Sequence, residues 1–220
     1  MPELDIDRSL PRLKTLAERE AAWQEVREAA RTCTDCPLFE IGTQTVFGVG
    51  PINARLMFIG EAPGAQEDKA GRPFVGPAGK LFDEALQHAG IDRDEVYVTN
   101  TVKHRPWIAG PTGRQKNRAP KQSEINACRQ WHVREVDLTR PELVVCLGAK
   151  AATEILGRDF KLTQQRGQWH STSAARHVLA TLHPSYVLIQ PRDSYDRVRD
   201  TFFSDFTTVA ERYRDTRRAA

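Results

Sequence analysis

Short apolar runs alternate with helical patterns along most of the chain. Four runs are apolar almost without interruption and end at turn-forming residues, which predicts buried strands at residues 55–59, 96–99, 143–147 and 177–182. Elsewhere apolar residues recur every three or four positions, which predicts helices at residues 11–31, 77–89, 123–137 and 149–157, and a closing helix around 198–213. Pro11 suits a first helical turn, and Gly90 suits the left-handed position that ends a helix.

Strands that alternate with helices are typical of a mostly parallel sheet covered on both faces. The pattern contains no internal repeat and no sign of a second domain, and 220 residues fit one domain with a full core. We therefore predict a single three-layer α/β/α domain over residues 1–220. Its parts are an N-terminal helix with a cysteine pair at 1–50, a core at 51–213 and a frayed tail at 214–220. Residues 161–172 are expected to form a hairpin or an irregular extension.

Composition narrows the class of protein without identifying its function. With 40% hydrophobic and 28% charged residues, the chain has ordinary globular composition. Its apolar runs are too short to span a bilayer, and its first residues lack the apolar centre of a signal peptide, so we expect a cytoplasmic protein with no membrane partner. The net charge of +3 is too small to indicate a nucleic-acid partner by itself.

The segment at residues 59–79 leaves the first predicted strand and enters the helix at 77–89. Its glycines allow the backbone to approach a ligand closely, and ligands in open α/β sheets bind at the carboxyl ends of strands. The side chains in this loop that are able to act in chemistry or stacking are Glu61, Glu67, Asp68 and Phe74. The alternative is a polar, glycine-rich loop without a ligand.

Asn100 and His183 follow two further predicted strands. A carboxamide offers a donor and an acceptor side by side, which matches O4 and N3–H of uracil and mismatches cytosine. An imidazole N–H directed at a carbonyl oxygen stabilises negative charge that forms on a leaving base. Taken alone, Asn100 is better explained by a turn, and a single histidine such as His183 is more often structural. We expect Glu61, Asn100 and His183 to converge in one crevice, which favours the functional interpretation.

Residues 103–121 contain three prolines, two glycines, six Lys or Arg and no acidic residue. This composition excludes a helix or a central strand and predicts a long exposed loop. Its charges suit contacts with phosphates, and Trp107 suits stacking on a base. The alternative is a solvated basic surface.

The four cysteines form a C-x2-C pair at Cys33 and Cys36 and two single residues, Cys128 and Cys146. Four thiolates from three places in the chain can complete one S4 site, and a reducing compartment disfavours disulfides. Iron–sulfur clusters tolerate such scattered ligands, whereas structural zinc usually takes two close pairs. The spacing leaves open a cluster, a zinc site or buried thiols without a metal.

Several motifs occur in order between Cys33 and Ser185: GEAPG-x2-ED-x2-GRPFVGPAG, VTNTVK, NRAP-x3-SEINAC, VVCLGAKAA and HPS. Together they resemble the family 4 uracil-DNA glycosylases, which carry an iron–sulfur cluster. The resemblance implies a monofunctional hydrolase that excises uracil from DNA in base excision repair, within a fold built on a four-stranded parallel sheet. It also implies a nucleoid-associated monomer whose partner is uracil-containing DNA, with the strand preference left open.

The resemblance also assigns roles to residues by position. Glu61 and His183 become the catalytic pair, Phe74 stacks on uracil and Asn100 reads its edge. The further expected substrate-binding residues are Gly60, Ala62, Gly64 and Asp68. The expected DNA-contacting residues are Lys103, His104, Arg105, Arg114, Lys116, Asn117, Arg118 and Ser185. The expected ligands of a 4Fe-4S cluster are Cys33, Cys36, Cys128 and Cys146. After His183, Tyr186 or Val187 is expected to fill the gap left by an extruded base.

One segment departs from the usual family 4 pattern. The insertion HRPWIAGPTGRQK, with His104 after VK, resembles the X-type branch, whose members become covalently trapped on uracil-DNA. In that branch a loop histidine, followed after two residues by a proline, is the trapping nucleophile. Counting back from Pro120 places Asn117 there. Because a carboxamide is a poor nucleophile, we expect turnover without covalent capture. The alternatives are a covalent trap and a non-catalytic DNA-binding module of the same fold.

Overall fold

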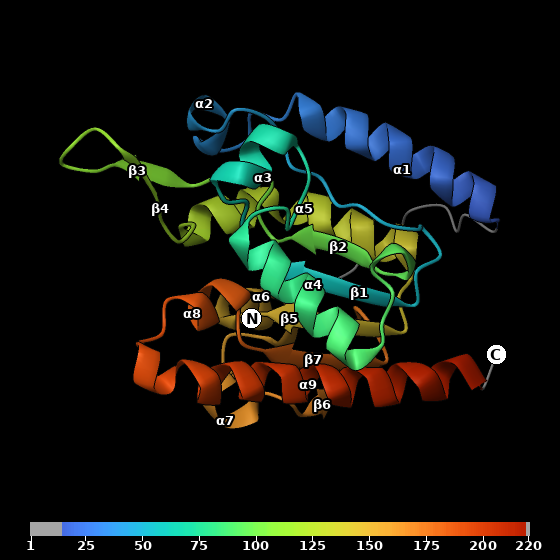
Figure 1. Cartoon of the computed structure of the whole chain (residues 1–220). Helices are drawn as coiled ribbons and strands as arrows, with labels where there is room; N and C mark the ends of the chain where they lie inside the picture. The colour runs from blue at the N-terminus through green and yellow to red at the C-terminus, as the bar shows by residue number, and fades with distance from the viewer. Residues whose placement is uncertain (1–14, 219–220) are drawn as a thin grey trace.

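A computed structural model describes residues 15–218 of the chain (Figure 1). Its centre is a five-stranded sheet in the order β2-β1-β5-β7-β6. The strands are β1 (Leu56–Gly60), β2 (Tyr97–Asn100), β5 (Leu143–Leu147), β7 (His177–Thr181) and β6 (Trp169–His170). The first four are parallel, as predicted, and β6 adds a short antiparallel edge strand beside β7. The expected four-stranded parallel sheet is therefore present, with one strand more.

Helices cover both faces of this sheet because alternate strand residues point to opposite sides. Met57 and Ile59 pack in one core with residues of α1, α5 and α6. Leu56 and Phe58 pack in a second core with residues of α4 and α9. These helices are α1 (Leu16–Arg31), α4 (Pro77–Ala89), α5 (Gln122–Thr139), α6 (Ala149–Leu156) and α9 (Arg192–Arg218). The three-layer architecture is confirmed.

Several helix ends follow from local sequence. α4 has the predicted bounds, with Pro77 at its first position and Gly90 after its end at φ +67°. α1 begins after Thr15, whose side chain accepts a hydrogen bond from the Glu18 backbone while Glu18 reaches back to the Thr15 N–H. The expected start at Pro11 lies outside the described residues.

Short elements fill the connections between the main ones. They are α2 (Leu38–Ile41), α3 (Ala65–Ala70), a 3-10 turn η1 (Arg93–Glu95), α7 (Leu162–Gln165) and α8 (Pro184–Leu188). α7 and β6 occupy the stretch expected to be a hairpin or irregular extension. The tail expected to fray from residue 214 instead remains helical to Arg218.

The basic segment after β2 is more ordered than predicted. It forms an antiparallel hairpin of β3 (Trp107–Ala109) and β4 (Gln115–Asn117), which extends away from the body of the molecule (Figure 1). The prediction of one exposed loop is wrong for its beginning, because Lys103, His104 and Arg105 are buried. Within residues 15–218, none of the helices combines the length and the apolar character that crossing a bilayer requires.

Candidate functional site

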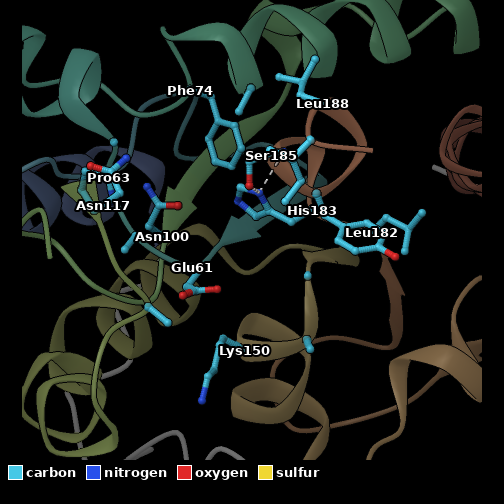
Figure 2. Close-up of a pocket in the computed structure, with 18 of the residues that line it drawn as sticks. Glu61, Pro63, Phe74, Asn100, Asn117, Lys150, Leu182, His183, Ser185 and Leu188 are labelled. Atoms are coloured by element: carbon cyan, nitrogen blue, oxygen red, sulfur yellow. Dashed lines mark hydrogen bonds between the residues drawn. The ribbon is translucent and has the colours of Figure 1, made fainter. Parts of the chain in front are cut away.

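A cleft of about 1040 Å³ opens at the carboxyl ends of the parallel strands. Glu61 follows β1, Asn100 ends β2 and His183 follows β7, and all three line this cleft together with Phe74. Figure 2 shows Phe74, Asn100 and His183 around a common space, with Glu61 on its remaining side. Segments that lie more than 120 residues apart in sequence therefore meet, as expected where the strand order switches between β1 and β5.

Asn100 presents an unused hydrogen-bond acceptor to the cleft. Its side chain is 2% exposed, and its Oδ1 is buried without a hydrogen-bond partner among the described residues. Gly60 is its register partner on β1, and a Cβ there would lie 2.3 Å from Oδ1. Because an unpaired buried acceptor is costly, this oxygen is suited to receive a donor from a ligand.

Phe74 forms one wall of the cleft in a strained backbone conformation. Its φ is +54°, a left-handed value that bulky residues rarely adopt. The ring packs against Phe82, with centroids 5.2 Å apart, and lies 6.0 Å from the His183 ring. The Glu67 carboxylate accepts hydrogen bonds from the backbone N–H groups of Gly64, Val75 and Gly76, which fixes the loop on both sides of Phe74. Glu67 is therefore a structural brace.

Glu61 is half-buried in the wall of the cleft. Burial raises the pKa of its carboxyl above the ordinary value, while the charge of Lys150 acts in the opposite direction. Lys150 is in the first turn of α6 and also lines the cleft, pointing away from Glu61 in Figure 2. Sequence reasoning did not single out Lys150, although its place after the β5 strand end was a usable signal.

His183 is held as a neutral imidazole with one defined tautomer. Its Nδ1 accepts a hydrogen bond from the backbone N–H of Ser185 at 3.2 Å and lies 2.7 Å from Ser185 Oγ. Because a backbone N–H only donates, Nδ1 carries no proton and Nε2 does. Burial lowers the pKa of His183 to about 4, so the ring is neutral near pH 7. Nε2–H is then available as a donor to a ligand.

Two expected substrate-binding residues stand behind the cleft rather than in its wall. Gly60 supplies the space that Asn100 and Phe74 occupy, since a Cβ there would also come within 2.6 Å of the Phe74 ring. The Asp68 carboxylate is buried and accepts hydrogen bonds from the backbone and hydroxyl of Thr43. Asp68 therefore does not line the cleft, whereas Ala62 and Gly64 do.

Comparison with known proteins identifies the family. The family model of the uracil DNA glycosylase superfamily matches residues 47–207. A type-4 uracil-DNA glycosylase of Thermotoga maritima is 39% identical over 171 residues, covering 77% of this chain and 85% of the relative. The chain belongs to the type-4 uracil-DNA glycosylases. A second relative of this type, from Pyrobaculum aerophilum, is 37% identical and covers 76% and 85% of the two chains.

A solved structure supports the fold of this type-4 glycosylase. The crystal structure of wild-type Pedobacter heparinus SMUG2 aligns with a TM-score of 0.51 at 14% identity, covering 72% of this chain and 77% of that one. At this identity the likeness concerns the fold alone. It agrees with the parallel sheet and two helical layers described above.

The basic hairpin of this type-4 glycosylase begins with buried cations. Arg105 donates from Nε to Asn117 Oδ1 and from Nη1 to Gln115 Oε1, each at 2.7 Å, so it braces β4. Lys103 and His104 are also buried. All three side chains are therefore withdrawn from the exposed surface on which their expected DNA contacts would be made. Trp107 donates its indole N–H to the Ile41 carbonyl, which anchors the hairpin to α2.

The rest of the hairpin remains available to a partner. Arg114, Lys116 and Asn117 are exposed, and Asn117 and Arg118 line the cleft. Arg118 pairs through both terminal nitrogens with Glu124 at the start of α5, which fixes the chain where it leaves β4. The DNA-contact candidates of this segment that remain accessible therefore lie on one projecting ribbon at the rim of the cleft.

The segment after His183 forms the opposite rim. Ser185 is exposed and lines the cleft, and Tyr186 is exposed as well. Val187 is 0% exposed, so the expectation that it fills the gap of an extruded base is wrong. Ile189 is 76% exposed and Leu188 is also exposed, and both line the cleft. The sequence pattern missed these two because the short helix α8 turns Val187, rather than its successors, toward the core.

The four cysteines belong to one of the two hydrophobic cores and form no disulfide. Cys33 lies after α1, Cys36 precedes α2, Cys128 is in α5 and Cys146 is in β5. Two sulfurs already receive N–H donors, from the Trp131 indole to Cys33 at 3.3 Å and from the Lys103 backbone to Cys128 at 3.2 Å. Among residues 15–218, however, no three or more Cys, His, Asp or Glu side chains are arranged as a metal site.

Proposed function

We propose that the protein hydrolyses the N-glycosidic bond of uracil in DNA and leaves an abasic site. One observation carries this proposal, namely the convergence of Glu61, Phe74, Asn100 and His183 on a single cleft that contains an unpaired buried acceptor. The curated relatives named as type-4 uracil-DNA glycosylases support the same chemistry. Uracil-containing DNA is then the substrate.

The cleft is suited to distinguish uracil from cytosine. Uracil presents an N3–H donor that Asn100 Oδ1 accepts, and its O4 accepts from the Asn100 amide. Cytosine presents an acceptor at N3 and a donor at N4, so both contacts become repulsive or unpaired. Phe74 supplies a flat apolar surface on which the ring stacks. Recognition therefore needs both the acceptor and the wall.

The base has to leave the helical stack to reach this cleft, because the glycosidic bond is inaccessible inside a duplex. Of the two side chains expected to fill the resulting gap, Tyr186 remains exposed at the rim. Arg114 and Lys116 on the projecting hairpin carry the charge that holds a phosphate backbone. The rim and the hairpin thus bind the DNA strand while the cleft receives the extruded base.

Bond cleavage develops positive charge on the sugar and negative charge on the departing uracil. The neutral His183 donates from Nε2 to uracil O2 and stabilises the negative charge without giving up a proton. The Glu61 carboxylate, when ionised, stabilises the sugar cation or orients the attacking water. Burial strengthens both interactions because the local dielectric is low.

We further propose that the four cysteines hold a 4Fe-4S cluster with a structural role. The donor set fits such a cluster, since it provides four free thiols in one core and two N–H groups directed at sulfur. The cluster would join the segment after α1 to α5 and β5. Iron and acid-labile sulfide, each measured per chain, should both be close to four, and Cys128→Ser should lower them together with the visible absorbance. Stoichiometric zinc in anaerobically purified protein would contradict this assignment.

The catalytic assignment is tested by single-turnover excision from a single-stranded uracil oligonucleotide, with alkali revealing abasic sites. Glu61→Gln and His183→Ala should each lower the rate constant by about 10²-fold or more, with thermal unfolding unchanged. Glu84→Gln and His88→Ala on the exposed face of α4 are the matched controls. If the double variant at 61 and 183 excised uracil at the wild-type rate, the proposed mechanism would be wrong. A denaturing gel of the same samples reports any covalent adduct, which we expect to be absent.

A further inference from the structure

A buried ion pair lies directly beneath the strand end that carries Asn100. Lys103 is 1% exposed and Glu135 is 0% exposed, and Lys103 Nζ bonds to Glu135 Oε2. Lys103 comes three residues after Asn100, whereas Glu135 comes from α5. Neither side chain reaches the cleft surface, so the mechanism described above does not use them directly.

Lys103 is directed at the backbone of Asn100. Its Nζ donates to the Asn100 carbonyl oxygen at 2.7 Å and to Thr99 Oγ1 at 2.6 Å, in addition to Glu135. An ammonium has three protons, and all three are used. The last two residues of β2 are therefore held from below by one side chain, and the Asn100 carboxamide projects from that held backbone into the cleft.

Glu135 is equally committed to this position. Its Oε1 accepts from the Gly48 backbone at 2.8 Å and from the Tyr97 hydroxyl at 3.0 Å, and its Oε2 accepts from Thr99 Oγ1 at 2.8 Å. Trp23 in α1 in turn donates to the Tyr97 hydroxyl at 2.7 Å. Contacts from the Gly48 loop and β2 thus converge on one carboxylate, and Trp23 of α1 holds one of the donors, Tyr97. This arrangement leaves the ammonium little freedom to move.

Stability alone does not account for this pair. Burying two charges costs as much as their attraction returns, and apolar replacements of similar volume are often neutral or stabilising. What the pair does provide is a fixed location for the Asn100 peptide. We propose that Lys103 and Glu135 are positioning residues for base recognition, holding the Asn100 carboxamide where it contacts the uracil edge. This inference rests on the proposed function, because it deepens the role of the same site.

The test is a double-mutant cycle between the pair and Asn100. Lys103→Met with Glu135→Gln removes both charges with little change of volume, and Asn100→Ala removes the recognising side chain. Arg55→Met with Glu142→Gln is the matched control, because that ion pair lies at the opposite end of β1 and β5. Single-turnover excision and competitive inhibition by free uracil are measured for each protein below its unfolding temperature.

We expect the pair variant to lower kcat/KM by about 10-fold to 10²-fold, the size expected for a positioning error near 1 Å, and to weaken inhibition by free uracil. In the Asn100→Ala background the same change should add less than about threefold, because its effect passes through Asn100. If the pair change lowered kcat/KM by the same factor with and without Asn100, the inference would be overturned. Wild-type kinetics in the pair variant would also overturn it. The control pair should leave both measurements unchanged.

A second variant keeps the test decisive if the pair variant does not fold. Thr99→Val removes the hydroxyl between Lys103 and Glu135 while keeping the side-chain shape and the ion pair. In the same cycle it should lower kcat/KM several-fold with Asn100 present and have no effect in the Asn100→Ala background. Equal losses in both backgrounds would overturn the inference. A wild-type protein unable to excise uracil would instead refute the proposed function, so the two failures are distinguishable.

Discussion

Replacing Gly60 with alanine tests the geometry of the cleft most directly. The added Cβ would lie 2.3 Å from Asn100 Oδ1 and 2.6 Å from the Phe74 ring, both inside the 3.0 Å that real Cβ contacts respect. The residue has no left-handed φ, so the substitution acts through this contact and not through backbone strain. One of the two recognition groups must then move by the better part of an ångström.

A displacement of about 1 Å in a positioning group lowers turnover by about 10²-fold. We therefore expect Gly60→Ala to lose about 2.7 kcal/mol of transition-state stabilisation, measured as kcat/KM in single-turnover excision of uracil. Gly110→Ala in the projecting hairpin is the control, because its Cβ would meet only the Arg114 carbonyl, at 3.1 Å. Wild-type excision and wild-type inhibition by free uracil in a folded Gly60→Ala protein would refute this reading of the cleft.

Two further predictions concern protonation and covalent capture. Because burial raises the pKa of Glu61 and lowers that of His183 to about 4, excision should fall with decreasing pH as Glu61 becomes protonated, at a pKa above that of an ordinary glutamate. Lys150→Met should move this acid limb of the pH–rate profile to higher pH, and an unshifted limb would show that the Lys150 charge does not act on Glu61. Asn117→His places an imidazole beside the Arg105 guanidinium and should give a denaturation-resistant adduct with uracil-DNA, whereas Asn117→Ala should not.

The convergence of Glu61, Asn100 and His183 was predictable because parallel strands bring their carboxyl ends to one edge of a sheet. Each residue ends or follows a run that is mostly apolar, so both the strand and its end were predictable from the sequence. The helix at Pro77–Ala89 was equally readable, since proline and glycine mark its two ends. These features depend on local pattern and on one topological rule.

The burial of Lys103 was not predictable by the same means. A lysine among prolines and arginines is typical of an exposed, solvated segment. Its partner Glu135 lies in another element, 32 residues later in the chain, so the sequence gives no sign of the pair. The position of Asp68 behind the cleft was likewise not predictable, because the Thr43 contacts to its carboxylate depend on how α3 meets a segment 25 residues earlier in the chain. Charge pattern alone does not distinguish a paired buried group from an exposed one.

Val187 shows a different limit of sequence-based prediction, namely which side chains of a short helix face the core. A single turn after Pro184 decides which side chains face the core, and a shift of one residue rotates the inward face by about 100°. The structure turns Val187 inward and leaves Tyr186, Leu188 and Ile189 exposed at the rim. No periodicity is measurable over five residues, so the sequence could not select among them.

The projecting hairpin is anchored at both ends, by Trp107 to the Ile41 carbonyl and by Arg118 to Glu124. Its turn is open, since a Cβ at Gly113 would meet nothing within 4 Å. Insertions or deletions at the tip of the hairpin should therefore leave these two anchoring contacts and the cleft unchanged. A fluorophore or a tethering peptide attached at this turn should therefore leave the cleft unchanged.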